Sequence, residues 1–132
     1  MAGVLDGKVG LIVGIANKRS IAWAVAQAAA REGAQLVLTH QDRFAEHLQE
    51  LAATLTPPPV LVPLDVQDDA QIDALFAQIS TAHSGLDFVL HGAAFAPRDE
   101  LTSPFTNTSR DGFRVALDVK IVTPSKYPAE QI

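Results

Sequence analysis

The residues whose types and spacing could do chemistry lie between a short apolar run and an alanine-rich stretch, at positions 14–22. Gly14 and Ala16 are small enough to let a phosphate group approach the backbone, and the Ser20 hydroxyl can donate to a phosphate oxygen. A helix that begins here would offer unpaired N–H groups to the same anion. The segment has only one glycine and departs from the G-x-G-x-x-G fingerprint. By itself, the spacing supports a phosphate site and a simple capped helix after a buried strand equally.

No other arrangement of side chains predicts catalysis or metal binding. The chain has no cysteine, no G-x-S-x-G elbow and no H-E-x-x-H spacing, and His83 and His91 are isolated. We expect His40 and His47 at the surface and Trp23 in the core. Acids at 65, 68, 69 and 73 fit helix caps and a solvated helix face better than a metal cluster. The patterns therefore predict no metal site.

Short apolar runs alternate with helical patterns along the chain. The run at 8–13 is typical of a strand buried on both faces, and the runs at 35–39, 60–65 and 86–91 are expected to form three further strands. Helical spacing covers 21–32 and 43–55, a stretch opened by Asp68 or Asp69, and about ten residues after Ser109. Ser20 and Ser109 can cap their helices, and Gly33 suits the position after a helix end. This alternation predicts an α/β fold with a parallel sheet and right-handed crossovers.

Composition and charge exclude several classes of protein. The chain has 132 residues, enough for one domain, and 48% of them are hydrophobic, which is enough to bury a core. Its formal charge is −5 and it shows no basic stripe, which argues against nucleic-acid binding. No apolar stretch approaches the roughly 20 residues of a membrane span, and the N-terminus does not resemble a signal peptide. We therefore expect a soluble, cytoplasmic protein.

Five stretches share their order and spacing with one known family. They are Gly14 to Asn17 with Ser20 to Trp23, Arg31 to Ala34, Leu64 to Val66, the run HGAAFAP at 91–97, and Arg110 to Phe113 leading into Ala116 to Val119. These stretches resemble the NADH-dependent enoyl-acyl-carrier-protein reductases, a divergent branch of the short-chain dehydrogenase/reductase superfamily. The resemblance implies a partial Rossmann fold, a doubly wound parallel sheet of strand order 3-2-1-4, truncated before the catalytic helix and the remaining strands.

The resemblance places the first cofactor contacts on the loop after the first strand. Gly14 and Ile15 are expected to lie against the adenosine ribose and the pyrophosphate, and Ser20 and Ile21 to contact the phosphates. Asp65 is expected to accept from the adenine amino group, while the Val66 N–H faces a ring nitrogen. From the residues alone, Asp65 could instead cap the next turn.

Gln41 occupies the position that senses the adenosine ribose, where typical NAD sites have an acid. A glutamine can still hydrogen-bond the 2′-hydroxyl, and Arg43 could attract a 2′-phosphate. The resemblance favours NADH as the cofactor, and NADPH stays open. The family resemblance also places Ala93 beside the cofactor's ribose and Ala96 on the substrate pocket. Phe95 matches a pocket position too, with a core aromatic as the alternative.

The resemblance ends at Val119. The family continues into a helix that carries the active-site tyrosines and lysine, whereas Tyr127 here is followed by five residues without a lysine. Pro124 and Pro128 also oppose the helix that would present a tyrosine–lysine pair. No catalytic residue is therefore assigned. We expect residues 1–119 to be the N-terminal dinucleotide-binding part of a Rossmann domain and residues 120–132 to be a non-homologous tail.

The resemblance implies an oxidoreductase of type II fatty-acid synthesis that reduces trans-2-enoyl thioesters with NADH, here in a truncated form that is inactive alone. It implies an enoyl-acyl-carrier-protein substrate and, for the full-length family, a homotetramer. One alternative is a non-catalytic NAD(H)-binding module or a partner of an intact paralogue. Another is a damaged or mispredicted reading frame, which the change of character at Lys120 favours over the module.

Overall fold

The computed structural model describes residues 3–132 and shows a four-stranded parallel sheet. The strands are β1 (Val9–Val13), β2 (Gln35–His40), β3 (Val60–Pro63) and β4 (Phe88–His91), in the order β3-β2-β1-β4. The predicted α/β class and the strand order 3-2-1-4 are confirmed. Leu11 in the centre of β1 pairs with Val37 on one side and Val89 on the other, and all five β1 residues are buried.

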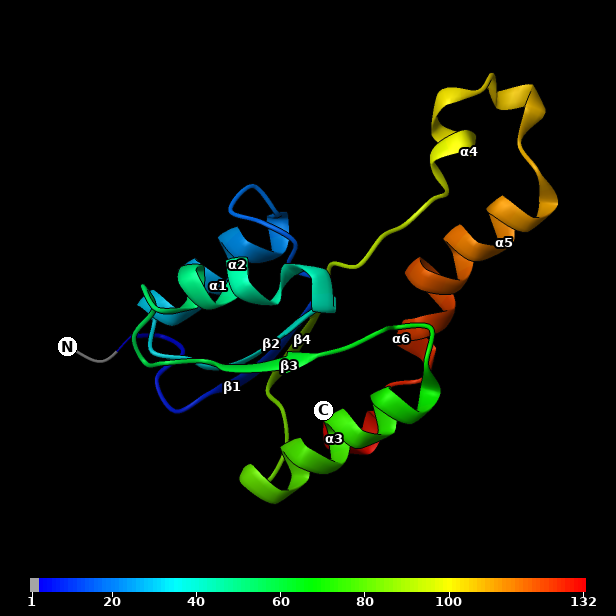
Figure 1. Ribbon diagram of the computed structural model, residues 1–132. Helices are drawn as coiled ribbons and strands as arrows, with labels where there is room; N and C mark the ends of the chain where they lie inside the picture. The colour runs from blue at the N-terminus through cyan, green and yellow to red at the C-terminus, as the bar shows by residue number, and fades with distance from the viewer. Residues whose placement is uncertain (1–2) are drawn as a thin grey trace.

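Helices cover both faces of the sheet (Figure 1). On one face lie α1 (Ile21–Arg31) and α2 (Ala45–Ala52), and on the other lies α3 (Asp69–Ala82). Alternate β1 residues face the two layers, because successive side chains of a strand point to opposite sides. Leu11 packs in the cluster with α3, and Ile12 packs in the cluster with α1 and α2.

The helices begin and end close to the predicted positions. Asp68 caps α3 by accepting from the N–H groups of Ala70 and Gln71 at 3.0 and 3.3 Å. Gly33 follows α1 with a φ of +93°, a conformation that favours glycine. The helix predicted over 43–55 is shorter, because residues 42–44 form a 3₁₀ turn before α2 begins. Trp23 on α1 is buried, as predicted.

The chain after β4 leaves the sheet and returns to it. A short helix, α4 (Arg98–Thr102), and the beginning of α5 (Arg110–Leu117) project away from the sheet (Figure 1). Ser109 caps α5 by accepting from the Gly112 N–H at 2.9 Å. A π-helical turn, Asp118–Val122, then continues α5 into the three-residue helix α6 (Thr123–Ser125).

Pro124 is accommodated at the start of a helix that ends at Ser125, so no helix carries Tyr127. Pro124 lies in the first turn of α6, where its missing N–H removes no intrahelical bond. The following Tyr127 is 8% exposed, and its ring centroid lies 5.5 Å from that of Phe76 on α3. Residues 118–131, called the C-terminal segment below, therefore form part of the layer that covers the α3 face of the sheet.

Each helix among residues 3–132 is too short or too polar to span a lipid bilayer. No group of three or more histidine or acidic side chains in the same range is arranged to hold a metal ion.

Candidate functional site

The predicted site residues lie at the carboxyl ends of the four parallel strands. Gly14 follows β1, Gln41 follows β2, Asp65 lies two residues after β3, and Ala93 lies two residues after β4. In doubly wound sheets, ligands bind outside this edge, where the strand order reverses. The reversal here is between β1 and β4, because β1 is followed in the chain by β2 on its other side.

Gly14 makes a close backbone approach to the chain after β4. Its φ is +95°, and a Cβ at this position would lie 2.7 Å from the Ala93 nitrogen. Only glycine is compatible with both constraints. The structure thus brings together two of the predicted residues, Gly14 and Ala93. The Gly14 N–H donates to Thr39 Oγ1 at 3.3 Å, and the Ile15 N–H donates to the Thr39 carbonyl at 3.3 Å, which fixes the loop to the end of β2.

Ser20 occupies the N-cap position of α1. The prediction that its side chain caps the helix is wrong, because the hydroxyl makes no hydrogen bond to the first turn. Its Oγ accepts from the N–H groups of Ala16 and Asn17, both at 3.1 Å, and so closes the loop before the helix instead. The hydroxyl oxygen is not free to accept from the helix because the loop directs two of its own N–H groups at it. The hydroxyl proton stays available to an external acceptor.

The first turn of α1 presents unpaired donors at this edge. The N–H groups of Ile21 and Ala22 have no acceptor among residues 3–132, as expected at a helix N-terminus. The Ile21 side chain is 83% exposed. Together with the Ser20 hydroxyl, these groups form a set of donors next to the positive end of the helix dipole. Such a set fits the oxygens of a phosphate or pyrophosphate.

At the end of β2, Gln41 is bound to Arg43. The Arg43 Nε donates to Gln41 Oε1 at 2.9 Å, and the guanidinium carbon lies 4.6 Å from the centre of the Phe44 ring. His40, expected at the surface, is 6% exposed, and its Nδ1 lies 2.9 Å from the Gln41 carbonyl oxygen. The expectation failed because β2 extends one residue further than its apolar run, so that the last residue of the strand is still covered.

Asp65 and Val66 form the turn between β3 and α3. One Asp65 carboxylate oxygen, Oδ1, accepts from the Gln67 N–H at 3.0 Å, so Asp65 does cap the next turn. The other oxygen, Oδ2, and the Val66 N–H have no hydrogen-bond partner among residues 3–132. An acceptor and a donor thus stay available on neighbouring residues. This is the complement that the amino group and ring nitrogen of adenine require.

Beyond β4, the chain carries the predicted substrate-side residues. Ala96 is half-buried, and Phe95 is 45% exposed, which rules out a core role for this aromatic ring. No hydrogen bond among residues 3–132 joins Gln41, Asp65 or Ala96 to the Gly14 loop. These residues share the carboxyl edge of the sheet without direct polar contact.

The residues that support the site from within the fold were not identified from the sequence. One is Thr39, which is 1% exposed and accepts a hydrogen bond from the Gly14 loop. The available signal for Thr39 was a polar residue at the end of an apolar run. Tyr127 donates its hydroxyl to His91 Nδ1 at 2.9 Å, and His91 Nε2 donates to the Val119 carbonyl at 2.9 Å. Burial lowers the pKa of His91, while the bond to Val119 partly opposes this shift. Burial also raises the pKa of the Tyr127 phenol.

A parallel sheet of this order, with a glycine turn and a helix N-terminus at its carboxyl edge, defines the class of protein: a Rossmann-like, doubly wound α/β domain. Comparison with known proteins specifies it further. Residues 14–126 match the family described as "Enoyl-(Acyl carrier protein) reductase". The chain belongs to this family. The match extends past Val119, the last residue of the predicted resemblance.

Individual relatives agree with the family match. The chain is 44% identical over 119 residues to the NADH enoyl-acyl-carrier-protein reductase FabI of Salmonella typhimurium, covering 89% of this chain and 45% of that protein. An Anaplasma phagocytophilum reductase crystallised in complex with NAD has a TM-score of 0.87 and 31% identity, with 96% of this chain and 48% of that chain covered. The Bacillus cereus reductase with NADP⁺ and indole naphthyridinone has a TM-score of 0.83 and 35% identity, with 97% and 53% covered. The chain thus spans about half the length of these relatives.

Proposed function

We propose that this chain binds NADH at the carboxyl edge of its sheet and supplies the dinucleotide-binding half of an enoyl-acyl-carrier-protein reductase of fatty-acid synthesis. The observation that carries the proposal is the set of unpaired donors at the start of α1, the Ser20 hydroxyl with the Ile21 and Ala22 N–H groups, beside the Gly14 turn. A dinucleotide places its pyrophosphate at such a helix N-terminus.

The other predicted residues then follow the dinucleotide along the edge. Asp65 Oδ2 accepts from the adenine amino group, and the Val66 N–H donates to a ring nitrogen of the adenine. Gln41 lies at the adenosine ribose. Gly14 and Ile15 lie along the ribose and the pyrophosphate. Ala93 packs against Gly14, and on this ground we propose that it lies beside the cofactor's ribose. The relatives' names support NADH. The Gln41–Arg43 pair presents further donors, so NADPH is the second candidate cofactor.

In the whole protein, the bound nicotinamide would supply a hydride to a trans-2-enoyl thioester carried by the acyl carrier protein. Phe95 and Ala96 are the residues of this chain that we place at the substrate. The only tyrosine, Tyr127, is buried, and its hydroxyl donates to His91, so it is not available to polarise a substrate carbonyl. We therefore assign no catalytic residue to this chain and propose that it does not reduce enoyl thioesters alone.

Further parts of the proposal concern the whole protein. A homotetramer and a cytoplasmic location are proposed from the family. The division into a dinucleotide-binding part, residues 1–119, and a C-terminal tail, residues 120–132, also stays a proposal, and the packing of Tyr127 bears on its second part. The alternative is a non-catalytic NAD(H)-binding module. It shares the predicted site and differs only in lacking a role in reduction.

Fluorescence titration of NADH with the purified chain tests the proposal. We expect saturable binding at one site per chain and no oxidation of NADH when a crotonyl thioester is added. The Ser20→Ala variant should bind several-fold more weakly, because it removes a donor and the acceptor that closes the loop. Ser103→Ala, on an exposed serine remote from the sheet, is the matched control and should bind as the unmodified chain does.

Two results would count against the proposal. Absence of saturable NADH binding would overturn the dinucleotide site. Measurable turnover of the crotonyl thioester would overturn the assignment of no catalytic residue, and would favour the enzyme over the binding module.

A further inference from the structure

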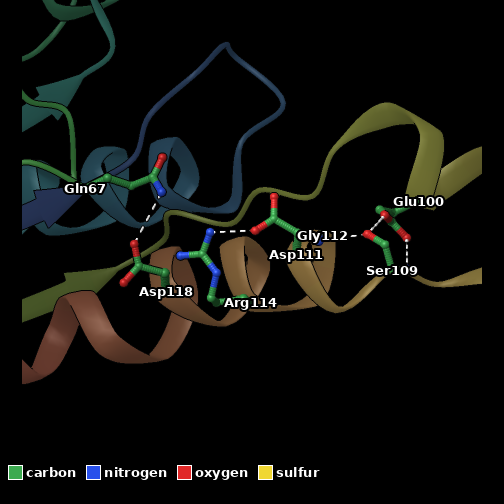
Figure 2. A network of polar contacts seen from close by, with 7 residues as sticks. All are labelled: Gln67, Glu100, Ser109, Asp111, Gly112, Arg114 and Asp118. Atoms are coloured by element: carbon green, nitrogen blue, oxygen red, sulfur yellow. Dashed lines mark hydrogen bonds and ion pairs between the residues drawn. The ribbon is translucent and has the colours of Figure 1, made fainter.

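The C-terminal segment is bonded to the turn that carries Asp65 and Val66. The Thr123 hydroxyl, 2% exposed, lies 2.9 Å from the Val66 carbonyl oxygen and 3.0 Å from the Asp118 carbonyl oxygen, and it donates to this pair of acceptors. Beside it, Gln67 Nε2 donates to Asp118 Oδ2 at 3.3 Å, a contact seen at one end of the polar contacts along α5 (Figure 2). Two side chains thus tie the segment to consecutive residues of the turn.

Both ends of the segment are anchored, so Thr123 is held in place. Lys126 Nζ lies 3.7 Å from an Asp69 carboxylate oxygen on α3. The buried Tyr127 packs on Phe76 and donates to His91 at the end of β4. Further along, the Gln131 carbonyl accepts from the Leu86 N–H at 2.7 Å. The segment therefore acts as a fixed support behind the turn.

One peptide unit transmits this support to the Asp65 carboxylate. Its carbonyl, that of Val66, accepts from Thr123, and its N–H, that of Gln67, donates to Asp65 Oδ1 at 3.0 Å. Peptide units are planar, so fixing the carbonyl also fixes the direction of the N–H. The N–H in turn orients the carboxylate. Two hydrogen bonds and one peptide unit thus link Thr123 to the Asp65 carboxylate, whose other oxygen, Oδ2, is free.

We propose that Thr123 is a positioning residue for base recognition: through the peptide between Val66 and Gln67, it aims the free Asp65 oxygen at the amino group of the adenine. This inference rests on the proposed dinucleotide site and names the residue that makes its base-specific part rigid. Thr123 touches no ligand atom itself. Thr123 affects the preference for one base over another. It does not affect the binding of the phosphates, which the first turn of α1 provides.

The ratio of the affinities for two dinucleotides that differ only in the base distinguishes a positioning role of Thr123 from a purely structural one. Hypoxanthine replaces the adenine amino group with a carbonyl oxygen, which cannot donate to Asp65. The experiment measures the affinity of the 132-residue chain for NADH and for reduced nicotinamide hypoxanthine dinucleotide. Loss of general stability would weaken both ligands equally, whereas loss of the Asp65 orientation weakens NADH alone.

The test variant is Thr123→Val, which keeps the side-chain shape and removes the hydroxyl. We expect the unmodified chain to prefer NADH over the hypoxanthine analogue by about tenfold, and Thr123→Val to reduce this preference to about twofold. Thr123→Ser, which restores the hydroxyl, should restore the preference. Thr81→Val is the matched control, because the Thr81 hydroxyl donates to the Gln78 carbonyl within α3, away from the turn.

The outcomes separate the inference from the function on which it rests. If the unmodified chain binds neither dinucleotide, the proposed function fails and the inference falls with it. If NADH binds and folded Thr123→Val keeps the full preference, the inference alone is overturned. Should Thr123→Val fail to fold, Thr123→Ala takes its place, because it also removes the hydroxyl that donates to the Val66 carbonyl. A reduced preference for NADH then supports the inference, and an unchanged preference overturns it.

Discussion

The two faces of the sheet are covered by layers built in different ways. The first layer consists of α1 and α2, and each of these helices is the next α-helix in the chain after its strand, α1 after β1 and α2 after β2. The second layer combines α3 with the C-terminal segment, whose Tyr127 lies 51 residues after its contact Phe76. The first face is therefore completed by local β-α units, whereas the second depends on a contact between distant parts of the chain.

Replacement of Trp23 by alanine should have the largest effect, because it opens a cavity in the first layer. Trp23 is 3% exposed and packs in the cluster with Ile12 and Leu38. We expect the free energy of unfolding to fall by about 3–5 kcal/mol, measured by urea denaturation. Phe105→Ala, at an aromatic residue that is 89% exposed, is the control and should change it little.

Replacement of Tyr127 tests whether the C-terminal segment belongs to the second layer. Tyr127→Ala should lower the free energy of unfolding by about 3 kcal/mol, because it leaves a cavity beside Phe76. Tyr127→Phe keeps the ring and loses only the bond to His91, so about 1 kcal/mol is expected from the same urea measurement. An unchanged stability of Tyr127→Ala would show that the C-terminal segment is a dispensable tail and does not contribute to the second layer.

His91 should make the free energy of unfolding weakly dependent on pH. Burial lowers its pKa in the folded chain below the ordinary value of about 6.5, so the unfolded chain binds the proton more tightly. The contribution of His91 to stability is therefore full above about pH 7 and is lost as the pH falls through 6.5 towards the lower folded value. In urea denaturation at several pH values, His91→Gln should lose this pH dependence of the free energy of unfolding. The control His47→Gln, at an exposed histidine, should retain it.

NMR titration of the His91 ring checks the same point directly. The bond from Nε2 to the Val119 carbonyl requires the proton on Nε2, so the ring should be in that tautomer at neutral pH. A pKa of His91 at or above 6.5 would contradict the half-buried, doubly bonded ring.

The topology could be predicted from the sequence because its signals are local. Apolar runs and helical spacing each lie within one element, and the glycine turns at 14 and 33 mark where elements end. The order β3-β2-β1-β4 and the family followed from these signals together with the motifs. Asp68 and Ser109 were found as caps for the same reason, since each cap acts within three residues of itself.

The errors and omissions concern contacts that are decided by the folded surroundings. The Ser20 oxygen is taken by the loop's own N–H groups and not by the helix. His40 is buried because the strand reaches it. Nothing in the spacing of the sequence joins Thr123 to Val66, or Tyr127 to His91, since these pairs lie 57 and 36 residues apart. Such pairings follow only from the path of the chain in space.

The proposed dinucleotide site is tested most directly by ¹H–¹⁵N NMR spectra of the chain during titration with NADH. The predicted result is saturable change in the amide signals of Gly14, Ile21 and Val66, three residues at the ends of different elements on one edge of the sheet. Signals from α4 and the start of α5, which project away from that edge, should stay unchanged. No saturable change, or changes confined to the projecting helices, would contradict the site.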